Sequence, residues 1–181
     1  MFDKEIIEQC RSGNLQDFRK LVEEVSPFAF SVAFRMLGDE ESAMDIVQET
    51  MITLWGKIWK LNSAEHFKMW LYKIVLNKCY DELRKKKRNP ELNPDGRTWE
   101  LIANKISENP SAAMENNEIS KIINLLSARL SPKQKAVFIL SDIDELSVNE
   151  ISAVTGMSSL NVKANLHYAR KKIAEMIEKY I

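Results

Sequence analysis

Hydrophobic residues recur at steps of three and four through most of the first 88 residues, which is the period of helices with one buried face. Gly38 is suited to end the first long helix, and Asp39 is suited to cap the next one. A third helix begins near Phe67 and continues to Arg88. The apolar positions of the three helices are Phe18, Leu21, Val25, Phe28 and Val32, then Val47, Met51, Leu54 and Ile58, and then Phe67, Leu71, Ile74, Val75 and Leu83.

The pattern weakens in residues 91–118, which contain Pro94, Gly96, Pro110 and several Asn and Ser. We interpret this stretch as a flexible linker between two domains, 1–90 and 119–181, in which the helical period resumes. Residues 99–106 could form an amphipathic turn that docks on a partner, and a loosely ordered segment explains them equally well. The sequence therefore predicts an all-α protein of two small, separately folded helical domains.

Residues 147–171, SVNEISAVTGMSSLNVKANLHYARK, predict two short helices around a tight turn. Ser147 and Glu150 form an S-x-x-E capping box at the start of the first helix. Gly156 stands where that helix must end in a left-handed conformation, and Ser158 can cap the second helix. An ordinary helical hairpin is the alternative. The polar second helix favours a helix-turn-helix whose second helix enters a DNA groove.

Once the apolar contacts between these two helices are assigned, the remaining side chains of the second helix can reach phosphates and base edges. They are Asn161, Lys163, Ala164, Asn165, His167, Tyr168, Arg170 and Lys171.

Composition excludes several classes of protein. Five Gly and five Pro leave little room for an all-β fold with many turns. No stretch approaches the length of a membrane span, and the acidic N-terminus is unlike a signal peptide, so we expect a cytoplasmic protein without membrane insertion. Cys10, Cys79, His66 and His167 lack metal-ligand spacing, so we expect no metal and no cofactor. No catalytic constellation is visible, which argues against an enzyme.

The net charge of zero conceals an uneven distribution. Residues 91–118 carry six acidic and two basic side chains, whereas residues 119–181 carry nine basic and six acidic ones. Residues 84–88 form a run of five cations, and Lys163, Arg170, Lys171 and Lys172 form a second basic cluster. Local clusters of this kind remain compatible with nucleic-acid binding.

Asp45, Gln48 and Glu49 fall on one face of the second predicted helix, at i, i+3 and i+4. Two carboxylates beside an amide suit bidentate partners such as Arg on another protein. From this pattern alone, a solvated helix face is the simpler interpretation.

The helix at 67–88 has a second stripe opposite its apolar one. It interleaves cations, an amide and an aromatic ring, and it can hold phosphates, bond a base edge and stack a base, as a single-strand surface requires. We assign Trp70 to the core rather than to base stacking. The preceding polar loop, residues 60–67, could form the wall of a pocket for an unstacked base. The stripe is Lys73, Asn77, Tyr80, Arg84 and Lys87.

Three segments together resemble bacterial RNA polymerase sigma factors, specifically the small two-domain extracytoplasmic-function (ECF) group of the sigma-70 family. LGDEESAMDIVQETMITLW (37–55) resembles the family's polymerase-clamp-binding helix. FKMWLYKIVLNKCYDELRKKKR (67–88) resembles its helix for reading the −10 promoter element. LSPKQKAVFILSDIDELSVNEISAVTGMSSLNVKANLHYARKKI (130–173) resembles its −35-reading domain.

The resemblance implies a role for each segment. Asp45, Gln48 and Glu49 would contact the beta-prime clamp coiled coil of core RNA polymerase; the beta flap, promoter DNA and an anti-sigma factor are the other implied partners. Melted −10 bases would be captured with a base pocket formed by Asn77 and the preceding loop. The implied −10 residues are Asn62, Ser63, His66, Lys73, Asn77, Tyr80, Arg84, Lys87 and Arg88. The implied −35 residues are Ser159, Asn161, Lys163, Ala164, His167, Arg170 and Lys171.

The sequence departs from the family pattern at three places. Asn165 and Tyr168 stand where basic residues are usual, which removes phosphate contacts. Residues 144–145 (Asp-Glu) replace a common glycine-containing turn. Residues 50–51 (Thr-Met) lack the Phe often seen after the Gln-acid pair, so packing on the clamp would be softer.

We therefore expect a non-enzymatic initiation factor that directs RNA polymerase to promoters. The linker would thread through the polymerase toward the RNA exit path, as the resemblance implies. A dimeric helix-turn-helix repressor or response-regulator output domain that acts alone on duplex DNA is the alternative. It would need a dimer face and a sensing domain, and the first 90 residues offer no ligand-pocket signature.

Overall fold

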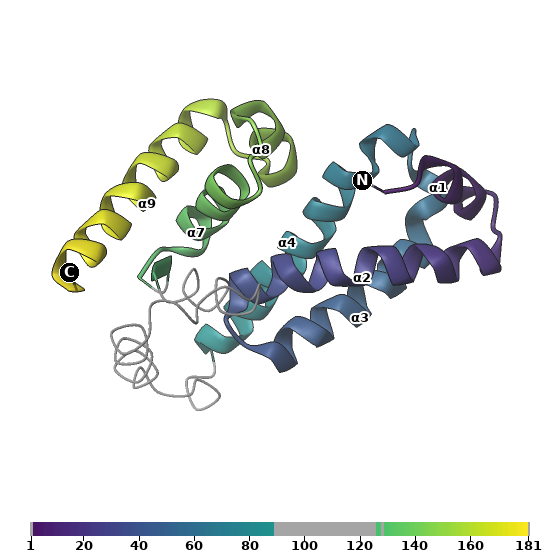
Figure 1. The fold of residues 1–181 in the computed structure, drawn as a ribbon, viewed down its shortest axis with the longest axis horizontal. Helices are drawn as coiled ribbons and strands as arrows, with labels where there is room; N and C mark the ends of the chain where they lie inside the picture. Colours follow the sequence, from purple (N-terminus) through teal and green to yellow (C-terminus); the bar gives the residue numbers. More distant parts are fainter. Residues whose placement is uncertain (1, 89–125, 128, 181) are drawn as a thin grey trace, which may run out of the picture.

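The structure is a computed structural model and describes residues 2–88, 126–127 and 129–180. All regular elements among these residues are helical, which confirms the predicted all-α class (Figure 1). The predicted linker, the amphipathic turn at 99–106 and the resumption of the helical period at Ile119 lie outside the described residues.

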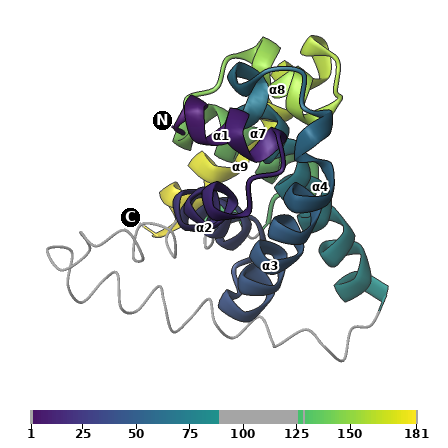
Figure 2. The same cartoon turned by 90° about the vertical axis from the view of Figure 1, so that its right-hand side faces the viewer.

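Four helices and two short 3-10 turns form the N-terminal half, which here means residues 2–88. Helix α2 packs against α1, α3 and α4, so it is the centre of this half (Figures 1 and 2). The elements are α1 (Lys4–Arg11), α2 (Leu15–Leu37), α3 (Glu40–Lys57), η1 (Ile58–Lys60), η2 (Ala64–His66) and α4 (Phe67–Arg88).

The predicted boundaries in this half are confirmed. Gly38 ends α2 in the left-handed region with φ 76°, where a residue without a Cβ avoids strain. The Asp39 carboxylate then accepts the backbone N–H of Ser42 at 3.0 Å and caps α3. Helix α4 runs from Phe67 to Arg88 as expected.

The C-terminal half, residues 126–180, is a helix-turn-helix preceded by one further helix. Ser131 and Ser147 each begin a helix with a reciprocal capping box, and Gly156 ends α8 with φ 73°. Its elements are α7 (Pro132–Phe138), the π-helical turn η4 (Ile139–Ile143), α8 (Val148–Thr155) and α9 (Ser159–Tyr180).

The Asp144-Glu145 turn between η4 and α8 adopts an unusual conformation. Glu145 has φ 57°, and it is the only residue other than glycine with a positive φ among the described residues. A left-handed conformation is sterically costly for a residue with a Cβ. A glycine is common in this turn according to the family pattern given above. Here Glu145 adopts the left-handed conformation instead, in spite of its steric cost.

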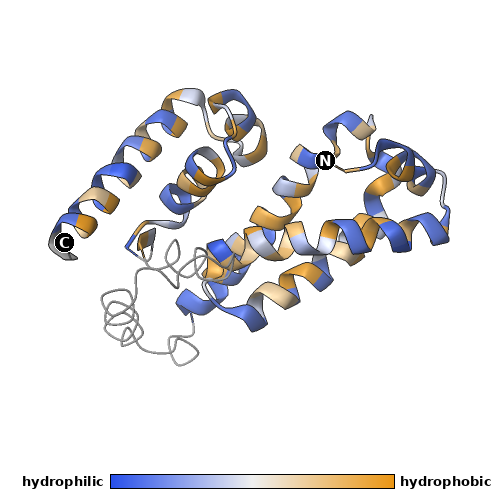
Figure 3. Cartoon of the chain, viewed as in Figure 1, coloured by the Kyte–Doolittle hydropathy of each residue, from blue (hydrophilic) through white to orange (hydrophobic). Residues whose placement is uncertain are grey.

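The two helical domains pack against each other in this structure. Helices α7 and α8 pack against α4, and α7 also contacts α2, so α7 and α8 lie between α4 and α9 (Figure 1). One continuous cluster of buried side chains includes Leu71 and Val75 of α4 together with Ile139 and Ile151 of the C-terminal half. Figure 3 shows the hydrophobic stripes of these helices alternating with polar ones. Long-range packing of this kind leaves no local signature in the sequence.

The capping box of α8 yields a stability prediction. In Ser147→Ala, the hydroxyl that accepts the Glu150 N–H at 3.3 Å and donates to the Glu150 carboxylate at 2.7 Å is lost. We expect the free energy of unfolding to fall by about 1 kcal/mol, the usual cost of removing such a cap. Urea denaturation followed by circular dichroism measures it.

Asn149→Ala, an exposed change in the same helix, is the matched control and should leave the unfolding free energy nearly unchanged. The hydrogen bonds from Ser147 lower the pKa of Glu150 below its ordinary value. The stabilisation that these hydrogen bonds give is therefore present at neutral pH and is lost as the pH falls through the lowered pKa of Glu150. The loss of unfolding free energy caused by Ser147→Ala should accordingly shrink in acid. Equal stability of Ser147→Ala and the unchanged protein at neutral pH would refute the prediction.

Candidate nucleic-acid interface

Helix α4 presents most of the predicted polar stripe to solvent. Because its apolar stripe is fixed in the core by Leu71, Val75 and Cys79, the opposite face must point outward. The stripe residues that are exposed are Lys73, Asn77, Arg84 and Lys87, and Arg88 beyond them is exposed as well.

Tyr80 differs from its neighbours in the stripe. Its ring is half-buried and packs against the core, and this burial raises the pKa of its hydroxyl to about 12. A ring held in this way offers less surface for stacking than the sequence suggested. Its proposed contact with a base stays a prediction.

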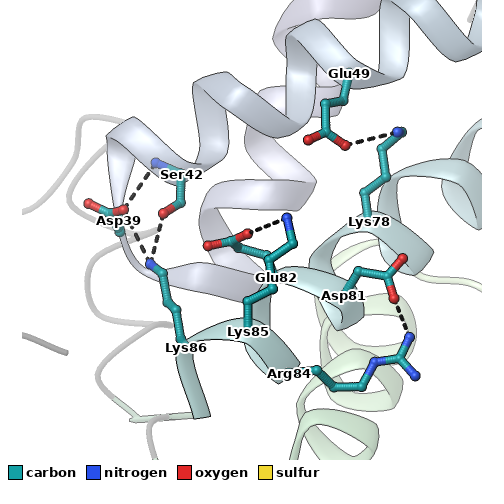
Figure 4. Close-up of polar contacts among 9 residues, drawn as sticks. All are labelled: Asp39, Ser42, Glu49, Lys78, Asp81, Glu82, Arg84, Lys85 and Lys86. Carbon is teal, nitrogen blue, oxygen red and sulfur yellow. Dashed lines mark hydrogen bonds and ion pairs between the residues drawn. The ribbon is translucent and has the colours of Figure 1, made fainter. Parts of the chain in front are cut away.

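Several basic side chains at the C-terminal end of α4 are already paired with carboxylates (Figure 4). Arg84 is paired with Asp81 one turn earlier, in an exposed ion pair. Lys86 reaches across to α3, where its Nζ lies 2.8 Å from Ser42 Oγ and 3.4 Å from Asp39 Oδ2. The run of five cations therefore includes one, Lys86, that anchors α4 to the start of α3.

A hollow of about 300 Å³ lies at the N-terminal end of α4. It brings together three of the predicted residues, Asn62 and His66 from the loop and Lys73 from the helix. Ser63 is not part of its lining; its hydroxyl accepts the Glu65 N–H at 3.2 Å and caps η2. The lining consists of Lys60, Leu61, Asn62, His66, Met69, Trp70, Lys73 and Ala153.

The sequence interpretation missed Met69, Trp70 and Ala153 in this lining. Trp70 is half-buried, so it contributes both to the core and to the wall of the hollow. It precedes Lys73 by three residues, and helix periodicity could have placed the two on one face. Asn77, one turn further along α4, is exposed but is not part of the lining.

The acidic patch on α3 is exposed as predicted. Asp45, Gln48 and Glu49 all face solvent, while Val47 and Leu54 are buried on the other side. Glu49 already has a partner within the chain: its carboxylate lies 3.1 Å from Lys78 Nζ on α4 (Figure 4).

Two large apolar side chains accompany the acidic patch. Ile52 is 73% exposed and Trp55 is 45% exposed on the same helix. An exposed apolar surface beside charged side chains is typical of a protein–protein interface.

Helix α9 divides into two faces as the sequence predicted. Val162, Leu166 and Ala169 are buried against the rest of the helix-turn-helix. The candidate DNA-contacting residues on the other face are all exposed: Ser159, Asn161, Lys163, Ala164, His167, Arg170 and Lys171.

Arg170 is exposed but already engaged. Its guanidinium donates two hydrogen bonds to Asp142 of η4, at 2.9 and 2.6 Å, and these bonds lower the pKa of the Asp142 carboxyl. This bidentate pair ties α9 to η4. For Arg170 to contact DNA, its ion pair with Asp142 would have to open, or the guanidinium would have to donate to Asp142 and to DNA at the same time.

The described residues contain no cluster of three or more His, Cys, Asp or Glu side chains able to hold a metal ion. None of the helices in the described part of the chain has the length and apolar content needed to cross a bilayer.

Comparison with known proteins matches both halves to one family. The family model for sigma-70 region 2 matches residues 21–89, and the model for sigma-70 region 4 matches residues 120–173. The chain is 29% identical to the ECF RNA polymerase sigma factor SigW of Bacillus subtilis, over 98% of this chain and 97% of that protein. It is 26% identical to the RNA polymerase sigma factor SigV of the same organism, over 93% and 89% of the two chains.

Solved structures share the fold. The structure of CnrH in complex with the cytosolic domain of CnrY has a TM-score of 0.69 at 24% identity and is matched over 97% of its length and 98% of this chain. The sigma factor RpoE in complex with the anti-sigma factor NepR, from Bartonella quintana, has a TM-score of 0.67 at 20% identity, over 98% of that chain and 91% of this one. Together the two family models cover more than half of the sequence, in the order region 2 and then region 4. The chain belongs to the sigma-70 family of bacterial RNA polymerase sigma factors, in its extracytoplasmic-function group.

Proposed function

We propose that this chain acts by two separate contacts with a promoter, capture of melted −10 bases by residues 1–90 and recognition of the −35 element by residues 119–181, with 91–118 as the linker. The family is one of non-catalytic factors for promoter-specific transcription initiation. The observation that carries the finer mechanism is the hollow at the start of α4, which adjoins an exposed row of polar and basic side chains.

The hollow has the size and chemistry to receive one unstacked base. Asn62, His66 and Lys73 supply hydrogen-bonding groups, and Trp70 supplies an aromatic wall. Extruding a base costs a few kcal/mol, and stacking on an aromatic side chain recovers about 1–3 kcal/mol of it. The remainder comes from hydrogen bonds to the base edge and from contacts with the neighbouring phosphates.

The cations farther along α4 would hold those phosphates. Lys87 and Arg88 are exposed, and the ion pair of Arg84 with Asp81 is exposed as well. Exposed pairs of this kind contribute little to stability, so a phosphate can displace the carboxylate at low cost. A short row of cations releases few counterions, so the free chain should bind DNA weakly.

The exposed face of α9 would enter the major groove of the −35 element. Asn161 and Lys163 lie in the first two turns of the helix, at the N-terminal end that contacts base edges in helix-turn-helix proteins. His167 and Lys171 lie farther along the same face and would contact the backbone. The Arg170–Asp142 pair would orient this helix rather than read a base.

Core RNA polymerase is the proposed partner of α3. Asp45, Gln48 and Glu49 would bind the beta-prime clamp coiled coil, with Ile52 and Trp55 adding apolar contact. The C-terminal half would bind the beta flap. Two structural relatives were solved with the anti-sigma factor NepR and with the cytosolic domain of CnrY, and we propose that an anti-sigma protein also binds this chain.

The polymerase contact is tested by reversing the charge of the α3 patch. In the double variant Asp45→Lys/Glu49→Lys, two exposed carboxylates become cations, and the new lysine at position 49 also faces Lys78. We expect binding to core polymerase in gel filtration to be abolished while the helical circular dichroism spectrum is unchanged.

The charge-matched control is Glu5→Lys/Glu23→Lys, two exposed positions on α1 and α2. It should retain polymerase binding. Unimpaired binding by the α3 variant, or equal loss in both variants, would remove the clamp assignment.

The role of Asn77 in base capture gives a second prediction. Asn77→Ala removes an exposed amide one turn beyond the hollow, next to Lys73. Open-complex formation should weaken more than closed-complex binding, because only melted bases reach this face. Permanganate footprinting measures the first and gel shift with duplex promoter the second. Gln16→Ala, an exposed amide on α2, should alter neither, and equal loss of both complexes in Asn77→Ala would contradict the role.

A further inference from the structure

Trp59 is a large aromatic side chain left on the surface beside the hollow. It lies in η1, and 61% of it is exposed to solvent. The Trp59 indole N–H donates to the Gly56 carbonyl at 3.0 Å, so the polar atom of the ring is already satisfied and the ring is held in one orientation. The exposed remainder is a flat aromatic surface whose one polar group is already used.

The backbone that carries this ring is anchored on both sides of Trp59. Ile58 before it and Leu61 after it are buried in the core, and the Leu61 N–H donates to the Ile58 carbonyl at 3.0 Å. The residues that follow are tied to α1, because Glu8 Oε1 accepts the Ala64 N–H at 3.2 Å. Little conformational entropy is therefore lost when a partner stacks on Trp59.

Lys60 connects this ring to the hollow. Its Nζ lies 4.9 Å from the centroid of the Trp59 ring, and the same lysine lines the hollow together with Trp70. One cation therefore adjoins both the exposed ring and the wall whose aromatic part is Trp70. Since Trp59 is mostly exposed, Lys60 covers only part of the ring, and the rest is open to a stacked partner.

The charge around Trp59 favours an anionic partner. Lys57 and Lys60 flank it in the sequence and are both exposed, and residues 50–64 contain no Asp or Glu. The acidic patch of α3, by contrast, ends at Glu49, so this helix is acidic in its middle and cationic at its end. A nucleic-acid strand offers both groups that the surface around Trp59 accepts, flat bases for the ring and phosphates for the lysines.

We propose that Trp59 is a second base-stacking platform, which receives the nucleotide next to the one held in the hollow. The inference rests on the proposed capture of a melted strand beside α4. Lys60 contacts the phosphate between the two nucleotides. Every base has an aromatic face, so stacking on Trp59 requires a base but does not select a particular one. This position of the strand therefore contributes affinity without contributing to a sequence motif.

Abasic substitution in a bound strand tests this platform. Holoenzyme made from core RNA polymerase and this chain first selects a single-stranded 12-mer from a random pool, with core polymerase alone as the counter-selection. Each position of the selected 12-mer is then replaced in turn by an abasic site, and the Kd is measured by fluorescence anisotropy. One position should depend on base identity. An adjoining position should lose about ten-fold in affinity when it is abasic but little when its base is exchanged.

Variants of Trp59 show whether its ring is responsible. Trp59→Ala should bind the intact 12-mer about ten-fold more weakly and should be indifferent to the abasic site at that adjoining position, because no ring is left to stack there. Trp59→Phe keeps a ring and should recover part of the affinity. His66→Ala, in the lining of the hollow, should lose the base preference at the neighbouring position and so identify it. Leu15→Ala, which also removes an exposed apolar side chain, is the control and should bind like the unchanged protein.

The two proposals fail in different ways. If the holoenzyme selects no strand above core polymerase alone, strand capture by residues 1–90 is wrong and the platform falls with it. If His66→Ala alters one position but Trp59→Ala keeps the sensitivity of the unchanged protein to every abasic site, strand capture stands and the platform is overturned. Equal affinity of Trp59→Phe and Trp59→Ala also overturns it. Weaker binding of Trp59→Ala to core polymerase, with the Kd for the strand unchanged, assigns the ring to a protein contact and overturns it as well.

Discussion

The burial of one stripe of α4 is the constraint on which the rest of this structure depends. Leu71, Val75 and Cys79 fix the rotation of the helix, because they are buried at the centre of the fold. That rotation decides which polar side chains face solvent and which surface α7 and α8 can cover. A rotation of α4 by one residue would bury cations and expose the core. The proposed nucleic-acid face is therefore a consequence of packing rather than an independent feature.

The same constraint decides which side chains α4 presents along its length. At its N-terminal end, α4 contributes Trp70 and Lys73 to a hollow that also receives a side chain from α8. Farther along the helix, Lys78 pairs with Glu49 of the acidic patch and Lys86 pairs with Asp39, the N-cap of α3 (Figure 4). Helices α3 and α4, for which we propose contacts with polymerase and with the melted strand, are thus joined directly by charge pairs.

Local features were predictable from the sequence, and long-range contacts were not. The capping boxes, the left-handed Gly38 and Gly156, and the limits of α4 follow from residue types at fixed spacing, and the structure confirms them. Periodicity also identifies the exposed face of α9. It cannot reveal that Arg35 meets a carboxylate 109 positions away, because a helix face does not specify its partner. For the same reason the half-burial of Tyr80 and the pairing of Arg170 with Asp142 were not foreseen.

Selection of start sites by the complete transcription complex tests the central claim most directly. Core RNA polymerase with and without this chain is given a library of linear templates with randomised upstream sequence, and the 5′ ends of the transcripts are mapped. The account predicts chain-dependent start sites that share two sequence elements at a constant separation, one for the exposed face of α9 and one for the hollow beside α4. Start sites identical to those of core polymerase alone, or enrichment of a single palindrome that the chain binds without polymerase, would contradict it.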